Sequence, residues 1–192
     1  MKAYLRPSEL LMAQVQDVGL PIPSQDLGQV TLRVAPLEGG VPAKTGTYDD
    51  TVVVDEPVWL GQQVVSIVKT RGQEELLFQM SGKEFQRVWE LVCNDLGIIA
   101  HSYQLRHSGA CDDSLSQRRT LLEIQARGRW ECARTMRRYT KPGQLQSSWQ
   151  RLSPEIQEYC ELCQEHLEGV VCNTIQGPLL PARKVRAVNL VR

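Results

Sequence analysis

The chain has 192 residues, of which 42% are hydrophobic and 23% are charged, and its formal net charge is zero. These values are ordinary for a globular protein with a real core, and the length and irregular cysteine spacing exclude a short disulfide-rich secreted scaffold. No apolar run approaches the length of a membrane span, so we expect a soluble intracellular protein, nuclear in a eukaryote and cytoplasmic otherwise.

The zero net charge hides an uneven distribution of basic residues. Residues 102–151 contain ten Lys and Arg but four Asp and Glu, a local net charge of +6. Residues 152–169 contain five Glu and no Lys or Arg. A basic segment of this kind is either a solvated face or a phosphate-binding surface, and its charge alone does not decide between them.

The first part of the chain predicts a helix followed by a small sheet. Apolar residues near helical spacing predict a helix over residues 1–18, which the sequence GLPIP ends. The runs VTLRV at 30–34 and TVVV at 51–54 predict two strands. The turn-rich segment between them predicts a hairpin with Lys44 near its tip. We therefore expect a small antiparallel sheet near the N-terminus.

Two longer helices are predicted next. The apolar pattern of residues 57–69 indicates one of them. The other begins near Ser81, an N-cap with Glu84 three residues later as in a capping box, and ends by Gly97. We expect five side chains of this second helix to point inward: Phe85, Val88, Trp89, Val92 and Cys93.

The second half of the chain is predicted to be helical. Three short helices are expected between residues 105 and 139, and an acidic helix is expected over 154–168, beginning at Ser153. Residues 177–192 are basic and interrupted by proline, which predicts a loose tail. The expected class is α+β, mostly helical, with a main domain at 1–145 and a C-terminal extension at 146–192.

Some of these segments hold residues suited to cutting a phosphodiester. That reaction needs a nucleophile, cations that stabilise the charge added at phosphorus, and an acid that protonates the leaving oxygen. Arginine suits the second role because its guanidinium can grip two phosphate oxygens. Lysine suits the third when neighbouring positive charge lowers its pKa, and tyrosine can be the nucleophile.

Four segments occur in the order YLRPSELL, AKTGTYDDTVVVD, SYQLRHSGA and GRWECARTMRRY. In this order they resemble the catalytic domain of the tyrosine recombinases, the family of the phage-type integrases, over about residues 3–143. The resemblance implies the fold of that domain, with its small sheet near the N-terminus. It also implies DNA cleavage and rejoining, for integration or site-specific recombination, through a 3′-phosphotyrosyl intermediate.

The resemblance assigns roles to residues of the first three segments. It implies that Arg6 and Arg106 grip the scissile phosphate and that Glu9 positions the groups around them. Lys44, in a Lys-Thr-Gly context, is implied to be the general acid toward the 5′-oxygen. Outside this context, an Arg–Glu pair three residues apart is commonly a surface ion pair, and a lysine in a turn is commonly only solvated.

The last segment supplies the nucleophile. The family has a His or Trp nine residues before the nucleophilic tyrosine, which matches Trp130 and Tyr139, although two aromatic residues at this spacing are in isolation more often core. Tyr103 stands three residues before Arg106, where the family usually has His. A phenol can hydrogen-bond phosphate but is a poor base at neutral pH. His107 is interpreted as a core residue, a cap or a phosphate ligand.

The implied partner is double-stranded DNA, with a homotetramer assembled on it and with neither a metal nor a small-molecule cofactor. Five basic residues near the nucleophile are the expected DNA contacts: Arg129, Arg134, Arg137, Arg138 and Lys141.

Family enzymes also carry an N-terminal helical domain that clamps the opposite face of the DNA. The first of the four segments begins too close to Met1 to leave room for this clamp, so we expect weaker and more salt-sensitive DNA binding. This leaves an alternative to the enzyme: a catalytically impaired remnant of a mobile element that binds only DNA or a partner subunit.

The acidic helix offers a competing site. Cys160, Cys163, His166 and Cys172 have a spacing that invites a zinc interpretation, but the first three fall within two helical turns and the loop expected between two ligand pairs is missing. Buried thiols on one helix face are the favoured interpretation. The helix itself either docks on a second protomer or folds back on its own chain and masks the basic segment.

Overall fold

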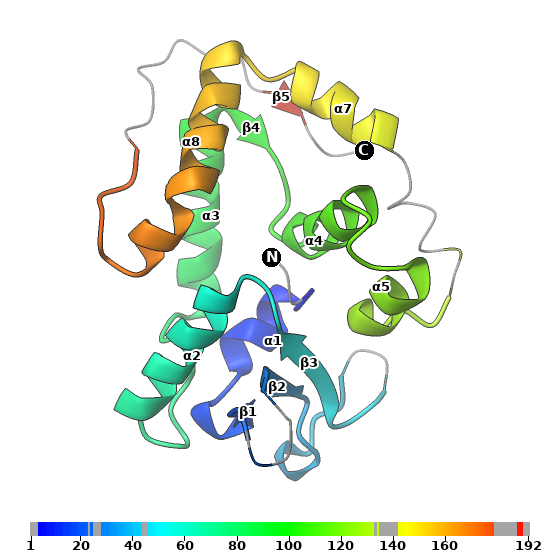
Figure 1. Cartoon of the computed structure of the whole chain (residues 1–192), viewed down its shortest axis with the longest axis vertical. Helices are drawn as coiled ribbons and strands as arrows, with labels where there is room; N and C mark the ends of the chain where they lie inside the picture. The colour runs from blue at the N-terminus through cyan, green and yellow to red at the C-terminus, as the bar shows by residue number, and fades with distance from the viewer. Residues whose placement is uncertain are drawn as a thin grey trace.

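The structure is a computed structural model that describes residues 4–22, 24, 28–43, 46–132, 134, 142–178 and 188–189. The predicted α+β class, mostly helical with a small antiparallel sheet, is confirmed (Figure 1). The described elements are α1 (Pro7–Met12), η1 (Val15–Asp17), β1 (Val18–Gly19), β2 (Val30–Val34), η3 (Leu37–Gly39), β3 (Asp50–Val54), α2 (Val58–Thr70), α3 (Gly82–Leu96), β4 (Ile98–Ile99), α4 (Gln104–Leu115), α5 (Leu121–Gly128), α7 (Pro142–Gln150), α8 (Pro154–Val171) and β5 (Val188–Asn189).

The first predicted helix is wrong at residues 4–6 and beyond Met12, because α1 covers only Pro7–Met12. The next residue, Ala13, is extended (φ −63°, ψ 130°), and its carbonyl accepts a hydrogen bond from the Leu77 N–H at 2.7 Å. The Val15 N–H donates to the Glu75 carbonyl at 3.0 Å. Backbone pairing with a distant segment therefore overrides the local helical pattern, which a sequence window cannot anticipate.

The sheet follows the predicted strands closely. β2 lies between β1 and β3, all antiparallel, with Val30 opposite Val54. The side chains of Val30, Leu32 and Val34 are buried while their neighbours on β2 are half-buried, as expected when one face is covered. α2, which confirms the predicted helix, contacts β2 and β3. The core between them contains Leu5, Ala13, Val30, Leu32, Val34, Val52, Val64 and Leu77.

The ends of α3 are confirmed. The Ser81 hydroxyl accepts from the Glu84 N–H at 3.2 Å, the Glu84 carboxylate accepts from the Ser81 N–H at 2.8 Å, and Gly97 ends the helix with φ 59°.

The inward face of α3 is narrower than predicted. Cys93 is buried and Phe85 and Trp89 are half-buried, but Val88 and Val92 are exposed, so their predicted burial is wrong. Phe85, Trp89 and Cys93 follow an i, i+4, i+8 spacing along one face of α3. Val88 and Val92 each stand one residue before a member of this row and lie outside it.

α4 and α5 form a second, smaller core. They confirm two of the three helices expected between residues 105 and 139, and most of the third lies outside the described residues. Their core contains Ala110 and Ile124 together with Tyr4 from the start of the chain. The N-terminal segment is thereby held beside α4 and α5, between them and α1 in Figure 1.

The C-terminal part is more ordered than predicted. α8 confirms the acidic helix and extends it to Val171, and α7, which precedes it, was not predicted. Cys172, the residue after α8, accepts a hydrogen bond from the Gln63 side chain of α2 at 3.1 Å, so the end of α8 is held to α2 of the same chain. The predicted loose tail is wrong at Val188 and Asn189, which pair in parallel with β4. No helix in the described ranges is long and apolar enough to cross a membrane.

Two residues of α5 test the second core. Ile124 is fully buried, whereas Leu122 is 77% exposed. We expect Ile124→Ala to lower the free energy of unfolding by about 2–4 kcal/mol, because it removes buried methyl groups and leaves a cavity. Leu122→Ala should change it by less than about 0.5 kcal/mol. Urea unfolding followed by circular dichroism measures both, and equal losses would contradict the packing of α5.

Candidate functional site

Three arginines from distant parts of the chain meet at one carboxylate, that of Glu9. Arg6 precedes α1, Arg106 lies in the first turn of α4, and Arg129 follows α5. The guanidinium of Arg6 forms an ion pair with Glu9, and Arg129 donates to it from NH2 at 2.5 Å. The Arg106 NH1 lies 3.7 Å from the same carboxylate. The structure therefore brings together two predicted phosphate-gripping arginines, the predicted positioning glutamate and one predicted DNA contact.

Local helix chemistry places Glu9 at this point. Glu9 is the third residue of α1, and its carboxylate accepts from the Arg6 backbone N–H at 2.7 Å, as in a capping box. Pro7 occupies the first helical position, where a missing N–H has no cost. The three-residue spacing of Arg6 and Glu9 thus begins α1 and also places these two residues together in the site.

Arg106 is fully buried and holds two backbone segments. Its NH1 donates to the Tyr4 carbonyl at 2.5 Å, and its NH2 donates to the Gly128 carbonyl. A Cβ added at Gly128 would lie 2.1 Å from the Trp130 ring, so this position has room only for glycine unless the indole moves. Arg106 therefore fixes the N-terminal segment against the end of α5.

The cluster carries a net positive charge, with three guanidiniums against two carboxylates. Burial alone raises the pKa of Glu9, but the hydrogen bond from the Arg6 N–H and the charges of Arg129 and Arg6 outweigh it and hold the pKa below its usual range. Burial, reinforced by the charges of Arg129 and Arg6, lowers the pKa of Arg106 to about 10. The Arg106 guanidinium therefore remains charged at neutral pH. The three arginines face two carboxylates, that of Glu9 and that of Asp50, which lies 3.7 Å from Arg129 Nε.

Aromatic rings cover one side of Arg106. Its guanidinium lies 5.1 Å from the centre of the Trp130 ring, a cation–π contact. Trp130 stacks on Tyr4 (6.0 Å between centroids) and on His107 (6.4 Å), and His107 meets the edge of Tyr103 at 4.9 Å. The predicted residues Trp130, His107 and Tyr103 therefore lie in one aromatic row, in which His107 is half-buried and Tyr103 is 43% exposed.

A second network of ion pairs lies beside the first. Asp55, which follows β3, pairs with Arg119 at 2.6 Å and with Arg127 at 2.7 Å. Asp113 of α4 also pairs with Arg119 at 2.6 Å and accepts from the Tyr4 hydroxyl at 2.5 Å. Sequence reasoning missed these four interactions, although Asp55 stands at the end of the AKTGTYDDTVVVD segment and therefore beside a predicted strand.

The two networks explain the basic segment at 102–151. Four arginines of this segment form ion pairs with buried or half-buried carboxylates: Arg106, Arg119, Arg127 and Arg129. Exposed Arg118 pairs with Asp112. Over the described residues of this segment, part of its excess charge is offset by three acids outside it: Glu9, Asp50 and Asp55. Over its described residues the segment is thus neither a simple solvated face nor an open phosphate-binding surface.

Several predicted residues cannot be placed. Lys44, Tyr139, Arg137, Arg138 and Lys141 lie outside the described residues. Arg134 is described and exposed.

The cysteines of α8 and Cys172, the residue after it, form no disulfide. Cys160, Cys163 and Cys172 are half-buried, and the His166 ring Nδ1 lies 2.8 Å from the Leu162 carbonyl. Within the described part of the chain, no group of three His, Cys, Asp or Glu side chains is arranged to hold a metal ion.

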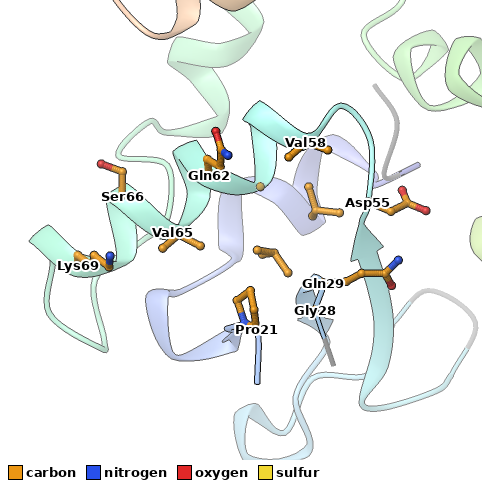
Figure 2. A pocket seen from close by; sticks show the side chains of 12 residues that line it. Pro21, Gly28, Gln29, Asp55, Val58, Gln62, Val65, Ser66 and Lys69 are labelled. Carbon is orange, nitrogen blue, oxygen red and sulfur yellow. The ribbon is translucent and has the colours of Figure 1, made fainter. Parts of the chain in front are cut away.

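A pocket of about 640 Å³ lies between α2 and the ends of β2 and β3 (Figure 2). Val30, Val54 and Val65 form its apolar wall, and Lys69 and Asp55 lie at opposite ends of it. The Asp55 carboxylate is already paired with two arginines, and the pocket lining includes none of the predicted site residues. The pocket is therefore separate from the arginine cluster.

Comparison with known proteins finds no matching protein family, curated protein or solved structure. The chemistry must therefore be inferred from the cluster itself. Three guanidiniums, a nearby indole and a surplus of positive charge form an arrangement that can bind an oxyanion.

Glu9 provides a test of the cluster that depends on pH. Because its pKa is lowered on folding, its carboxylate stabilises the protein at neutral pH, and this contribution is lost as the pH falls below about 4.3 and through the folded-state pKa. We expect Glu9→Gln to lower the free energy of unfolding by about 1.5–3 kcal/mol at pH 7 and by progressively less in acid. Urea unfolding at pH 7 and at an acidic pH measures this difference, with Glu74→Gln, at an exposed glutamate, as the control. A loss of unfolding free energy that is the same at both pH values would refute the stabilising role of the Glu9 carboxylate.

Proposed function

We propose that this protein cuts and rejoins double-stranded DNA through a covalent bond between Tyr139 and a 3′-phosphate, as the tyrosine recombinases do. One observation carries the proposal. Arg6 and Glu9, from the first resembling segment, lie beside Arg106 and Trp130 from the third and fourth. A chance match of short segments gives no reason for these residues to meet in space.

The proposed reaction is an exchange of two bonds at phosphorus. The hydroxyl oxygen of Tyr139 bonds to phosphorus as the bond from phosphorus to the 5′-oxygen breaks. The phenolic proton leaves to solvent, and the Lys44 ammonium protonates the departing 5′-oxygen. Attack of a 5′-hydroxyl on the phosphotyrosine reverses the steps and reseals the strand. Integration and site-specific recombination both follow from this chemistry when the attacking 5′-hydroxyl belongs to a different DNA strand from the one that was cut.

The cluster supports this reaction by electrostatics. Arg6 and Arg106 supply positive charge for the five-coordinate phosphorus, and Trp130, whose ring lies against the Arg106 guanidinium, is proposed to help stabilise it. Tyr103 is exposed beside His107, and its hydroxyl is a proposed donor to the bound phosphate. Exposed Arg134 is a proposed contact to the DNA backbone, and assembly of a homotetramer on DNA is part of the same proposal.

A second candidate, a remnant that binds DNA or a partner subunit without cutting, is favoured by one observation. The Arg106 guanidinium is fully buried and donates to two backbone carbonyls, so in this conformation it has no exposed surface for phosphate. The two candidates differ in whether a covalent intermediate forms.

A suicide substrate decides between these candidates. We expect the full chain to become covalently attached to DNA that carries a nick near the cleavage site, because the short released strand diffuses away before resealing. Tyr139→Phe should bind the same DNA and form no adduct. Denaturing gel electrophoresis detects the adduct. DNA binding by both proteins without any adduct would exclude the enzyme and leave the remnant.

Lys44 is tested through the leaving group. Lys44→Ala should slow cleavage of ordinary DNA by about 10²–10⁴-fold, the range of general acid catalysis. A 5′-phosphorothiolate, whose sulfur leaves without protonation, should restore most of the rate. The rate of adduct formation on the two substrates is the measurement. A variant that stays equally slow on both would remove Lys44 from the acid role.

A further inference from the structure

We propose that Arg129 is a phosphate-binding residue of this site and that Arg6 and Arg129, with Arg106 behind them, contact the phosphate directly. The sequence suggests only a DNA contact near the nucleophile for Arg129 and assigns the direct contact with phosphate to Arg6 and Arg106. This inference deepens the proposed function and rests on it for the identity of the ligand as DNA.

The backbone of Arg129 directs its side chain into the cluster. Arg129 follows α5 in the left-handed conformation (φ 51°, ψ 44°), and its N–H donates to the Ala126 carbonyl at 2.9 Å. Glycine or asparagine is usual at such a helix end, because other side chains are strained there. The strained turn brings the guanidinium of Arg129 to Glu9, which is 120 residues earlier in the sequence.

Buried donors of the cluster lack acceptors. Among the described residues, no hydrogen-bond partner exists for Nε and NH1 of Arg129, for Nε of Arg6 or for Nε of Arg106, and all four atoms are buried. Guanidinium nitrogens only donate, and buried donors are nearly always paired in folded proteins. Two of the four belong to Arg129, so it has the largest unmet capacity. An oxyanion supplies the acceptors that these groups require.

The exposure of the three side chains decides which of them meets a ligand. The side chain of Arg106 is 0% exposed, whereas those of Arg6 and Arg129 are 12% and 8% exposed. Arg6 and Arg129 therefore form the outer edge of the cluster. Arg106 adds charge from behind and, through the Tyr4 and Gly128 carbonyls, holds the two segments that carry the outer arginines.

The charge of the cluster indicates the class of anion. Three guanidiniums face the carboxylates of Glu9 and Asp50, which leaves one net positive charge. A phosphodiester carries one negative charge and balances this excess, whereas a terminal phosphate monoester carries nearly two. The ligand expected from the cluster is therefore a phosphodiester, the linkage within a nucleic-acid strand.

The test uses dTpdT, a dinucleotide whose single phosphate is a diester, titrated into the full chain at constant ionic strength. We expect Arg129→Met to weaken binding by about tenfold or more, the effect of losing one charge-assisted hydrogen bond to phosphate. Arg118→Met, which removes an exposed arginine outside the cluster, should bind as the wild type does. Thymidine, without a phosphate, controls for contacts to the base. Equal affinities of the wild type and Arg129→Met would overturn the proposal.

A second variant and a measurement on the wild type guard against misfolding. Arg129→Asn removes the charge and suits the left-handed backbone, so it should fold and should bind dTpdT as weakly as Arg129→Met. In the wild type, dTpdT should protect Arg129 from modification by phenylglyoxal, as read by peptide mass spectrometry. An Arg129 that is modified equally with and without dTpdT would overturn the proposal without any variant.

The outcomes separate this inference from the proposed function. Binding of dTpdT that depends on Arg129, with no DNA adduct at Tyr139, would keep the phosphate site and reject strand cleavage. Adduct formation by Arg129→Asn at the wild-type rate and affinity would reject the role of Arg129 and keep strand cleavage.

Discussion

The arrangement of the arginine cluster depends on one buried cation. The Arg106 guanidinium donates to the carbonyls of Tyr4 and Gly128, which belong to the first residues of the chain and to the last turn of α5. Buried carbonyls need donors and a buried guanidinium needs acceptors, so loss of either partner leaves polar groups unpaired inside the protein. This mutual requirement fixes the two segments together, and Arg6 and Arg129 reach the same carboxylate as a result.

Neutralisation inside the fold changes the meaning of the charge distribution. A strongly basic segment suggests an extended positive surface, but several of its arginines pair with acids from α1, from the residue after β3 and from α4. Among the described residues, one point keeps a local excess of positive charge, because the three guanidiniums of Arg6, Arg106 and Arg129 outnumber the two acids there. A site of this kind suits recognition of a single phosphate at a defined position, whereas a broad basic surface binds many phosphates with little geometric preference.

The sequence predicted those features that local patterns determine. The strands β2 and β3, the helices α2 and α8 and the capping box of Ser81 and Glu84 are encoded within a few neighbouring residues. The early end of α1 and the pairing of Val188 with β4 depend on distant backbone partners, which no local window contains. The order of the four segments anticipated that Arg6, Arg106 and Trp130 belong together. The sequence named Arg129 only as a DNA contact, and it could not anticipate the approach of Arg129 to Glu9, which depends on a left-handed turn, or the acids of the second network.

The contact between Gly128 and Trp130 gives one backbone position control over the whole aromatic row. The indole occupies the volume that any side chain at 128 would need, and the same indole stacks on Tyr4 and on His107. A larger residue at this position would push the Trp130 ring aside and would therefore disturb its stacking on both Tyr4 and His107. Aromatic rings are rigid and cannot change shape to relieve such a clash. Position 128 should therefore tolerate few replacements, although glycine has no functional group of its own.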